Sequence, residues 1–245
     1  MAWNLLAGFL IGLAYLSACI LVVGVAYRVF LYVKSPAPLK IVLTPGPKTS
    51  SGVVARLLGD VLIFPNLFQA DKLLWVGASV FHHALLFVFI RHTRYFIYPI
   101  PDWLIDIQPI CIAMGFILPI PALYLFWRRL AMPRNLYISG VPDYIALGLV
   151  LAVAATGILV SYYARVYLVD VKAFILGLLV LKPVAPPQHP LFLVHFILVC
   201  ALMIYFPFSK LMHAGGIFFS PTRNQRDNVL QQRYVNPWNE EVNID

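Results

Sequence analysis

The chain has 245 residues and a formal net charge of +8, yet only 11% of its residues are charged and 61% are hydrophobic. Soluble domains carry roughly 25% charged residues, so this composition excludes an ordinary soluble globular protein. The mean hydropathy of +0.83 indicates a protein of the lipid bilayer. Membrane orientation accounts for the excess of positive charge, and we expect no nucleic-acid partner.

Five apolar stretches are close to the length of about 20 residues that a membrane-spanning helix needs. They lie near Trp3–Tyr32, Lys72–Ile90, Ile107–Trp127, Tyr144–Tyr167 and Pro190–Met212. The first is uncharged up to Arg28 and has no basic segment before it, which predicts a retained helix and not a cleaved signal peptide. A further apolar run, Ala173–Leu181, is too short to span. The predicted fold is all-α, an integral membrane bundle of five helices.

The Lys and Arg residues are divided unequally between the segments that connect these helices. With the N-terminus outside, 13 of the 18 basic residues face inward and five face outward, namely Arg91, Arg94, Arg165, Lys172 and Lys182. Basic residues concentrate in the cytoplasmic loops of membrane proteins. The sequence therefore predicts an N-terminus outside the membrane and a C-terminus in the cytoplasm.

The chain divides into four predicted parts. They are a first transmembrane helix over residues 1–33, a cytoplasmic loop over 34–71, a core of four helices over 72–213 and a cytoplasmic tail over 214–245. The loop opens in extended form at Pro36, Pro38, Pro45 and Pro47. Ser50 or Ser51 is expected to cap a short amphipathic helix over Val53–Ile63, which lies in the membrane interface or meets a partner. The tail turns polar at Arg223, Arg226, Arg233, Glu240 and Glu241.

The three cysteines carry no recognisable metal motif. Cys19, Cys111 and Cys200 lie singly in three different apolar stretches, without a C-x-x-C or a C-x-x-C-H sequence. This excludes a cysteine-ligated iron–sulfur cluster within the chain and a covalently attached c-type haem. We expect the cysteines to act as small apolar packing residues.

Two pairs of histidines carry the functional signal. His82 and His92 lie ten residues apart in the second predicted helix, and His195 and His213 lie eighteen apart in the fifth. Polar side chains at bilayer depth are costly and are usually functional. One imidazole from each of two neighbouring helices is the ligand set of six-coordinate haem iron. The four histidines therefore predict two haems b.

The predicted topology fixes which histidines meet. Helices two and five run antiparallel, which joins His82 with His213 (the inner pair) and His92 with His195 (the outer pair). On one continuous helix, His195 and His213 return to the same face after five turns, with a kink expected at Pro207. A lone histidine in a membrane helix is more often a hydrogen-bonded packing residue than a ligand. Four at matched depths favour ligands, and His83, which points away from His92, is left outside the set.

Four arginines are candidates for pairing with haem propionates. Arg91 and Arg94 lie near the outer pair, whereas Arg128 and Arg129 lie on the inner side. Arginine binds carboxylates through two parallel hydrogen bonds, which suits it to propionates. The alternative interpretation is that these residues are interfacial or positive-inside anchors.

Three segments resemble the cytochrome b (gamma) subunit of respiratory nitrate reductase. They are Phe81-His82 with His92, the stretch Phe206–His213 with His195 eighteen residues before its end, and Arg128–Leu130 with Pro133, Arg134 and Asp143. The likeness covers roughly residues 72–213 and implies the same pairing, His82 with His213 and His92 with His195. The family's quinol-binding lysine near the start of helix three has no counterpart here, because Asp106, Ile107 and Gln108 occupy that region.

The tail suggests a subgroup of this family. Residues 218–228 are similar to the tail of cytochrome b subunits in sulfur-metabolism complexes, with the M subunit of the dissimilatory sulfite-reductase-associated complex closest. That resemblance implies a cytoplasmic iron–sulfur subunit similar to heterodisulfide reductase as partner, together with other membrane and periplasmic redox subunits. It also implies the cytoplasmic membrane of a bacterium or archaeon.

These observations predict a dihaem cytochrome b that oxidises menaquinol or another membrane quinol and passes electrons inward. Iron with two histidine ligands has no open position, so electron transfer is its natural task. Candidate quinol contacts near the outer pair are Tyr95, Asp102, Asp106, Gln108 and His189, where a carboxylate or histidine can accept a proton. The alternatives are a gamma subunit of a nitrate-reductase-type complex, a haem-free membrane anchor and a transporter.

Overall fold

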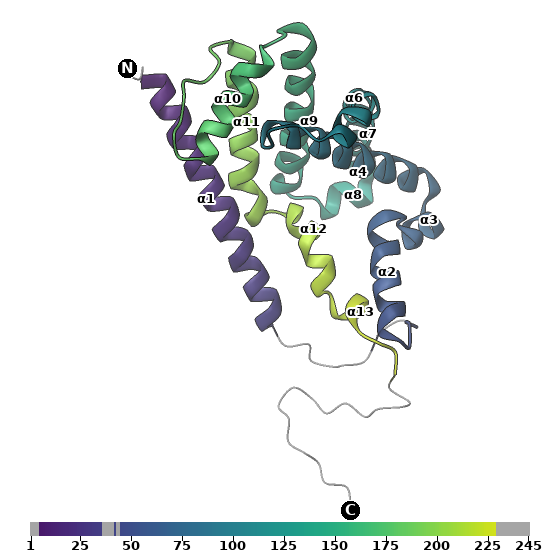
Figure 1. Cartoon of the computed structure of the whole chain (residues 1–245). Coiled ribbons are helices and arrows are strands. Elements are labelled where there is room, and N and C mark those ends of the chain that lie inside the picture. Colours follow the sequence, from purple (N-terminus) through teal and green to yellow (C-terminus); the bar gives the residue numbers. More distant parts are fainter. Residues whose placement is uncertain (1–4, 36–41, 43–44, 229–245) are drawn as a thin grey trace, which may run out of the picture.

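The computed structural model describes residues 5–35, 42 and 45–228, and every regular element among them is a helix (Figure 1). Five helical segments in this part of the chain are long and apolar enough to cross a membrane, which confirms the predicted five-helix membrane fold. The segments are Leu5–Lys34, Lys72–Tyr95, Gln108–Ala131, Val141–Tyr163 and Pro190–Phe208. Pro36, Pro38, Arg233, Glu240 and Glu241, named above, lie outside the described residues.

Most of the five candidate spans consist of more than one helical element. Their elements are α1 (Leu5–Lys34), α4 (Lys72–His92) with a 3₁₀ turn at Thr93–Tyr95, α6 (Gln108–Ile117), α7 (Pro119–Ala131), α9 (Val141–Ile158) with a π turn at Leu159–Tyr163, and α11 (Pro190–Tyr205) with a 3₁₀ turn at Phe206–Phe208. The shorter helices are α2 (Ser50–Leu62), α3 (Pro65–Ala70), α5 (Asp102–Asp106), α8 (Pro133–Ile138), α10 (Leu168–Leu179), α12 (His213–Gly216) and α13 (Pro221–Asn224).

Proline and aspartate set several of the helix starts. Pro119 divides the third span into α6 and α7, because proline has no N–H to continue the helical hydrogen bonds. Asp71 caps α4 by accepting a hydrogen bond of 2.9 Å from the Leu74 N–H. That bond and the nearby Arg128 guanidinium hold the pKa of Asp71 below its usual value.

The spans pack in a series across the molecule. Helix α1 lies against α11, α11 against α9, α9 against α7, and α7 against α4, which also packs along α6. In Figure 1, α1 and α11 run downward and α9 runs upward. Small residues allow close approach at some contacts, as membrane helices generally require. Gly77 of α4, for example, is buried against the Tyr124 ring of α7.

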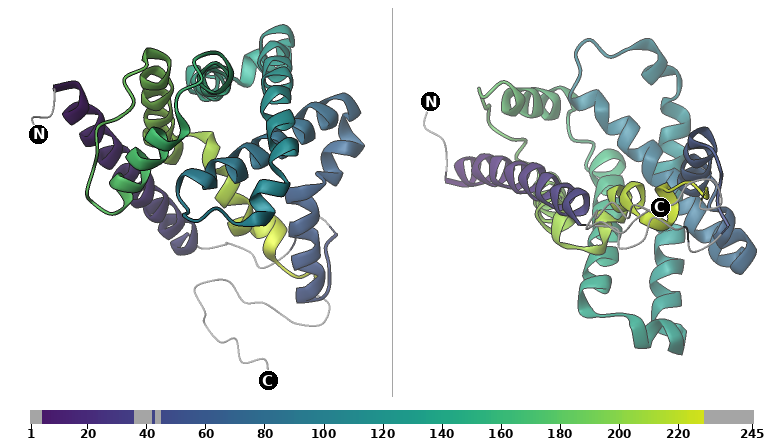
Figure 2. Two further views of the ribbon diagram at one scale, coloured as in Figure 1. Left: turned by 45° about the horizontal axis from the view of Figure 1, so that its top comes forward. Right: turned by 90° about the horizontal axis from the view of Figure 1, so that it is seen from below.

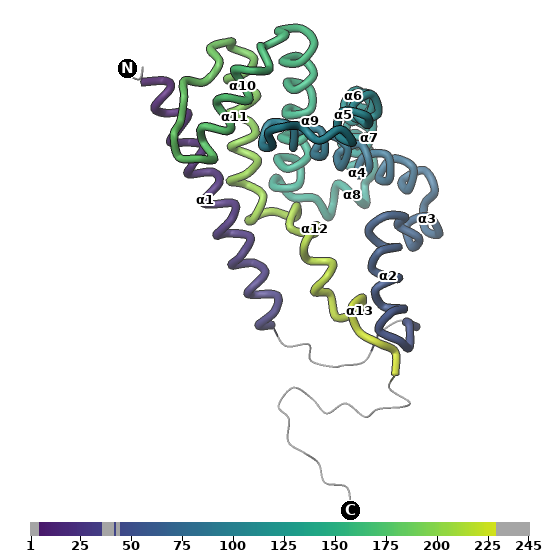
Figure 3. The backbone as a smooth tube through the Cα atoms, viewed as in Figure 1, coloured from purple at the N-terminus to yellow at the C-terminus, as the bar shows by residue number. Residues whose placement is uncertain are grey.

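The chain between His195 and His213 is not one continuous helix, so the prediction that the two residues share one helix face after five turns was wrong. Helix α11 ends at Tyr205, and after the turn that contains Pro207 the backbone becomes extended at Ser209, with φ −117° and ψ 173°. Figure 3 shows the resulting bend between α11 and α12. A second short turn, Lys210–Met212, then leads into His213 at the start of α12.

Two smaller sequence predictions also need correction. The cap of α2 is Thr49 rather than Ser50 or Ser51, and its hydroxyl accepts a hydrogen bond of 3.1 Å from the Gly52 N–H. The fourth span ends at Tyr163 instead of Tyr167, because the π turn closes it. The run at Ala173–Leu181 contributes to α10, which is not among the candidate spans in the described chain.

The segments predicted as a cytoplasmic loop and a cytoplasmic tail are in contact with each other. Arg223 of α13 forms an ion pair of 2.5 Å with the buried Asp60 of α2. The Asp227 N–H donates to the Pro47 carbonyl at 2.9 Å, and the Asp227 carboxylate accepts from the Gly46 N–H at 3.2 Å. Figure 2 shows α2 and α13 side by side. We call this contact the loop–tail clasp.

Substitution of Gly77 tests the packing of α4 on α7. A Cβ atom at Gly77 would lie 2.6 Å from the Tyr124 ring, so Gly77→Ala forces the two helices apart. Overpacking of this kind costs about 1–3 kcal/mol. We expect a lower thermal midpoint in detergent, whereas Gly148→Ala, with no atom within 4 Å of the added Cβ, leaves it unchanged or raises it. Equal midpoints for the two variants would contradict this packing.

Candidate functional site

The four predicted histidines lie as two pairs of neighbouring side chains, and the rings of one pair are in contact. The rings of His82 in α4 and His213 in α12 form the inner pair, with centroids 6.0 Å apart and planes at 89°. In the outer pair, His92 at the end of α4 and His195 of α11 are close enough to interact electrostatically. In the described chain α4 packs chiefly on α6 and α7, whereas α11 packs chiefly on α1 and α9. The pairs therefore join α4 to a part of the chain that packs mainly on other helices.

Each paired imidazole has a hydrogen-bond partner at Nδ1. His82 bonds to the Ala78 carbonyl, His92 to the Val88 carbonyl and His213 to the Lys210 carbonyl, each at 2.7 Å, while His195 bonds to the Thr156 hydroxyl at 2.9 Å. A carbonyl only accepts, so in the first three the proton lies on Nδ1. A bond of this kind leaves Nε2 unprotonated and orients the ring.

The inner pair has the spacing that haem iron requires. An imidazole nitrogen lies about 2 Å from a bound transition metal and the ring centre about 1 Å behind it, so two rings on opposite faces of one iron have centroids roughly 6 Å apart. The separation of 6.0 Å between His82 and His213 fits this arrangement. Two neutral nitrogens, one on each face, are the axial ligands of a b-type cytochrome.

Aromatic rings surround the inner pair. Phe81 and Phe64 each lie with their ring centroids 5.2 Å from that of His82. Phe64 caps α3 in the left-handed region, with φ 55°, where a residue with a Cβ is strained. The segment that begins with α2 therefore reaches the inner pair through Phe64, a contact that no sequence pattern indicated.

Helix α9 provides the surroundings of His195 in the outer pair. Besides the Thr156 hydroxyl, Gly157 lies against the imidazole, and a Cβ at that position would be 3.2 Å from His195 Cε1. Neither residue is among the candidates predicted from the sequence. Their signal is a Thr-Gly step in an apolar helix just before a π turn, an element that is frequent at functional sites.

Of the candidate quinol residues, only Tyr95 contacts a paired histidine in the described chain. The Tyr95 ring lies 5.8 Å from that of His92, which brings it to the outer pair. Asp102 and Asp106 are exposed on α5, and Gln108 begins α6, which packs along α4. His189 caps α11, where its Nδ1 accepts from the Leu191 N–H at 3.2 Å. Within the described chain these last four make no hydrogen bond or ring contact with the paired histidines.

The arginines named by the sequence have protein partners in three of four cases. Arg91 donates to the Tyr162 hydroxyl at 3.5 Å, and the Tyr162 ring in turn stacks obliquely on Phe116. Arg128 pairs with Asp71 at 3.1 Å, and Arg129 donates to the Ser139 hydroxyl at 3.0 Å. Arg94 is half-buried in the turn after α4. His83 bonds to the Ser79 carbonyl at 2.7 Å, outside both pairs.

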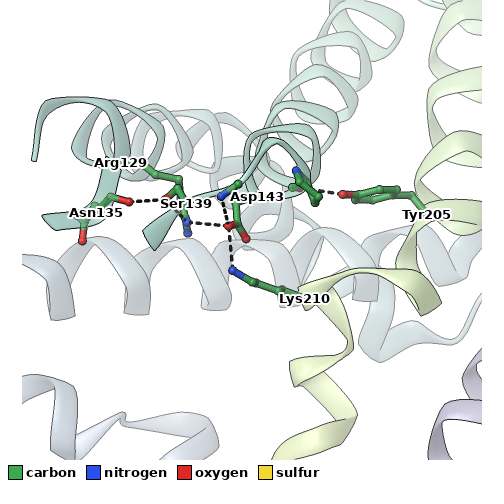
Figure 4. Close-up of polar contacts among 8 residues, drawn as sticks. Arg129, Asn135, Ser139, Asp143, Tyr205 and Lys210 are labelled. Atoms are coloured by element: carbon green, nitrogen blue, oxygen red, sulfur yellow. Dashed lines mark hydrogen bonds and ion pairs between the residues drawn. The ribbon is translucent and has the colours of Figure 1, made fainter. Parts of the chain in front are cut away.

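A polar network fixes the stretch that precedes His213 (Figure 4). The buried Asp143 carboxylate accepts from Lys210 Nζ at 2.8 Å and from the Gly140 N–H at 3.0 Å, with Arg129 at 3.8 Å. The carbonyl of the same Lys210 accepts from His213 Nδ1. Nearby, the Tyr205 hydroxyl donates to the Pro142 carbonyl at 2.8 Å. The start of α9 therefore supports the inner pair through Lys210.

The fold and the paired histidines define a class, a helical membrane protein that carries paired imidazoles between its helical segments. The family model of the nitrate reductase gamma subunit matches residues 66–233. Two curated relatives are each named Hdr-like menaquinol oxidoreductase cytochrome b-like subunit. The chain is 34% identical to the one from Archaeoglobus fulgidus, over 91% of this chain and 81% of the relative. It is 31% identical to the one from Archaeoglobus profundus, over 92% and 81%. The chain belongs to the nitrate reductase gamma subunit family, which confirms the resemblance.

Replacement of Asp143 tests the network. Asp143→Asn removes the charge that faces Lys210 and Arg129, and hydrogen bonds to charged groups are stronger than neutral ones. We expect a lower thermal midpoint in detergent, with the difference from the wild type shrinking as salt screens the pair. Asp170→Asn, at an exposed carboxylate of α10, is the control. If both variants melt alike, the network does not stabilise the fold.

Proposed function

We propose that this chain is the dihaem cytochrome b subunit of a menaquinol-oxidising membrane complex. In this proposal His82 and His213 ligate the inner haem, and His92 and His195 ligate the outer haem. The observation that carries it is the inner pair, whose ring separation of 6.0 Å matches axial ligation of one iron. The names of the two Archaeoglobus relatives, cytochrome b-like subunits of a menaquinol oxidoreductase, support it.

The ligand set determines the kind of chemistry. Haem with two histidine ligands has no open coordination position and supplies one-electron transfer when bound. The chain's part is to hold the imidazoles of His82, His92 and His213 with Nε2 unprotonated, through the Nδ1 hydrogen bonds described above. Phe64 and Phe81 place apolar rings against His82.

We place quinol oxidation at the outer pair, with the N-terminus outside and the C-terminus in the cytoplasm. The supporting facts are the excess of Lys and Arg on the inward segments and the position of Tyr95 beside His92. In this arrangement Asp106 or His189 accepts a quinol proton, Gln108 and Tyr95 contact the quinol ring, and Arg91 and Arg94 bind the outer propionates. Arg128 and Arg129 stay near the inner haem, although their present partners are Asp71 and Ser139.

The loop–tail clasp is our candidate docking surface for a cytoplasmic iron–sulfur subunit. It joins the two segments that the sequence assigned to the inward face, through Arg223 with Asp60 and through Asp227 with Pro47. Helix α2 exposes an apolar stripe there, made by Val54, Leu58 and Leu62. Phe64 links the same segment to the inner pair, which would give electrons a short path from the inner haem to the partner. We propose a heterodisulfide-reductase-like partner in sulfur metabolism, since both relatives are named Hdr-like.

The haem ligands are tested by single substitutions. We expect His92→Ala or His195→Ala to remove the outer haem and His82→Ala or His213→Ala to remove the inner one, because each iron loses an axial ligand. His83→Ala, the neighbouring control, should keep both. The measurement is the haem-to-protein ratio with a reduced-minus-oxidised spectrum. A His195→Ala protein that keeps two haems with unchanged spectra would falsify the pairing, and a wild type without haem would indicate a membrane anchor.

The docking surface is tested by two truncations. A chain that ends after Ser220 loses Arg223 and Asp227, whereas one that ends after Asn228 keeps the whole clasp. We expect both to bind two haems and only the longer one to copurify with the iron–sulfur subunit and reduce it. Normal electron exchange by the shorter chain would rule out this surface. Loss of electron exchange in both truncated chains would indicate that the partner docks on residues after Asn228.

The quinol site is tested in oriented membrane vesicles. Asp106→Asn or His189→Gln should slow quinol-driven haem reduction at least about tenfold, because proton transfer to a positioned base is lost, while reduction by dithionite stays normal. A membrane potential opposing inward electron flow should also slow it, at about 2.3 kcal/mol per charge per 100 mV. Asp170→Asn is the control. A rate that ignores the potential, with protons released inside, would place the site at the inner pair.

A further inference from the structure

His195 differs from the other three paired histidines in what holds it. Their Nδ1 atoms bond to backbone carbonyls one turn back in the same stretch of chain. The Nδ1 of His195 instead lies 2.9 Å from the side-chain hydroxyl of Thr156, on the neighbouring helix α9. The Val153 carbonyl is a second possible acceptor near the same imidazole. The orientation of this ring therefore depends on a different helix.

The other contacts of Thr156 decide the direction of the hydrogen bond. Its hydroxyl lies 2.7 Å from the Ala152 carbonyl and 3.2 Å from the Val153 carbonyl, both of which only accept. A hydroxyl has one proton to donate and lone pairs to accept with. The proton goes to the carbonyl of Ala152, so Thr156 Oγ1 presents a lone pair to His195. The imidazole must then carry its proton on Nδ1, and Nε2 is free.

The residue after Thr156 leaves room for this ring position. Gly157 faces His195, and a Cβ there would come within 3.2 Å of Cε1 and 3.8 Å of Nδ1, tighter than most contacts of real side chains. The π turn at Leu159–Tyr163 begins two residues after Gly157. Helix α9 thus supplies both an acceptor for the ring and the space in which the ring stands.

We propose that Thr156 is a positioning residue for the outer haem, acting through His195. It sets the tautomer and the angle of the imidazole by accepting the Nδ1 proton. A partner at Nδ1 also increases the basicity of a ligating histidine, which favours the oxidised metal. This inference rests on the proposed function, because it assumes that His195 ligates iron.

The test compares Thr156→Val, which keeps the shape and loses the hydroxyl, with Thr156→Ser, which keeps the hydroxyl. The full-length chain in its membrane complex is examined by electron paramagnetic resonance and by redox titration. We expect Thr156→Val to shift the signal of one haem and to move its midpoint potential to more positive values, with the other haem unchanged. Thr156→Ser should restore both. Ser17→Ala is the control, since the Ser17 hydroxyl bonds to the Ala14 carbonyl in α1.

Loss of the outer haem in Thr156→Val, with recovery in Thr156→Ser, would also support the proposal. Unchanged signals and potentials in Thr156→Val would overturn it and indicate that the Val153 carbonyl takes the proton instead. Loss of the haem in both variants would overturn it as well, because the hydroxyl would then not be the cause. The His195→Ala variant distinguishes failure of the proposed ligand from failure of the positioning role of Thr156. If it retains two haems, the proposed ligand is wrong. If it loses one while Thr156→Val is silent, only the positioning role fails.

Discussion

The arrangement of the site depends on how each imidazole is held at Nδ1. A histidine that is free to rotate in a membrane helix would point either nitrogen toward its partner, at a cost in side-chain entropy on binding a ligand. Here three of the paired rings bond to backbone carbonyls and the fourth to a hydroxyl, each within 2.9 Å. These bonds fix which nitrogen is available before any ligand arrives. Pairing across α4, α11 and α12 follows from that preorganisation together with the packing of the helices.

The break after α11 is the second determinant of the inner pair. A straight helix through Pro207 and Ser209 would carry His213 along the axis of α11, away from α4. The extended backbone at Ser209 turns the chain, and Lys210, anchored to Asp143, begins the new turn that presents His213. The backbone carbonyl of the same lysine accepts a hydrogen bond from His213 Nδ1. The motif Phe206–His213 therefore acts as a bent connector whose sequence encodes the position of His213.

Much of the fold, and the contact of His82 with His213, was predictable from the sequence. Hydropathy gave five spans, because a bilayer requires about 20 apolar residues in a row, and antiparallel topology gave the pairing of His82 with His213. The bend at Ser209 was not predictable from the periodicity of an apolar segment. Thr156, Gly157 and Phe64 were missed because they act through contacts with histidines of other helices, and the sequence around them does not say which helix they face. Likewise, no sequence pattern indicates the ion pair of Arg128 with Asp71, which lies 57 residues earlier in the chain.

We propose above that the four histidines hold two haems, each with an imidazole on both faces. The most direct measurement is pyridine-haemochrome analysis with iron counting on the isolated complex, together with near-infrared magnetic circular dichroism of the oxidised protein. We expect two haems b for each copy of this chain, both low-spin with two histidine ligands. A single haem, or a high-spin haem with an open axial position, would contradict it.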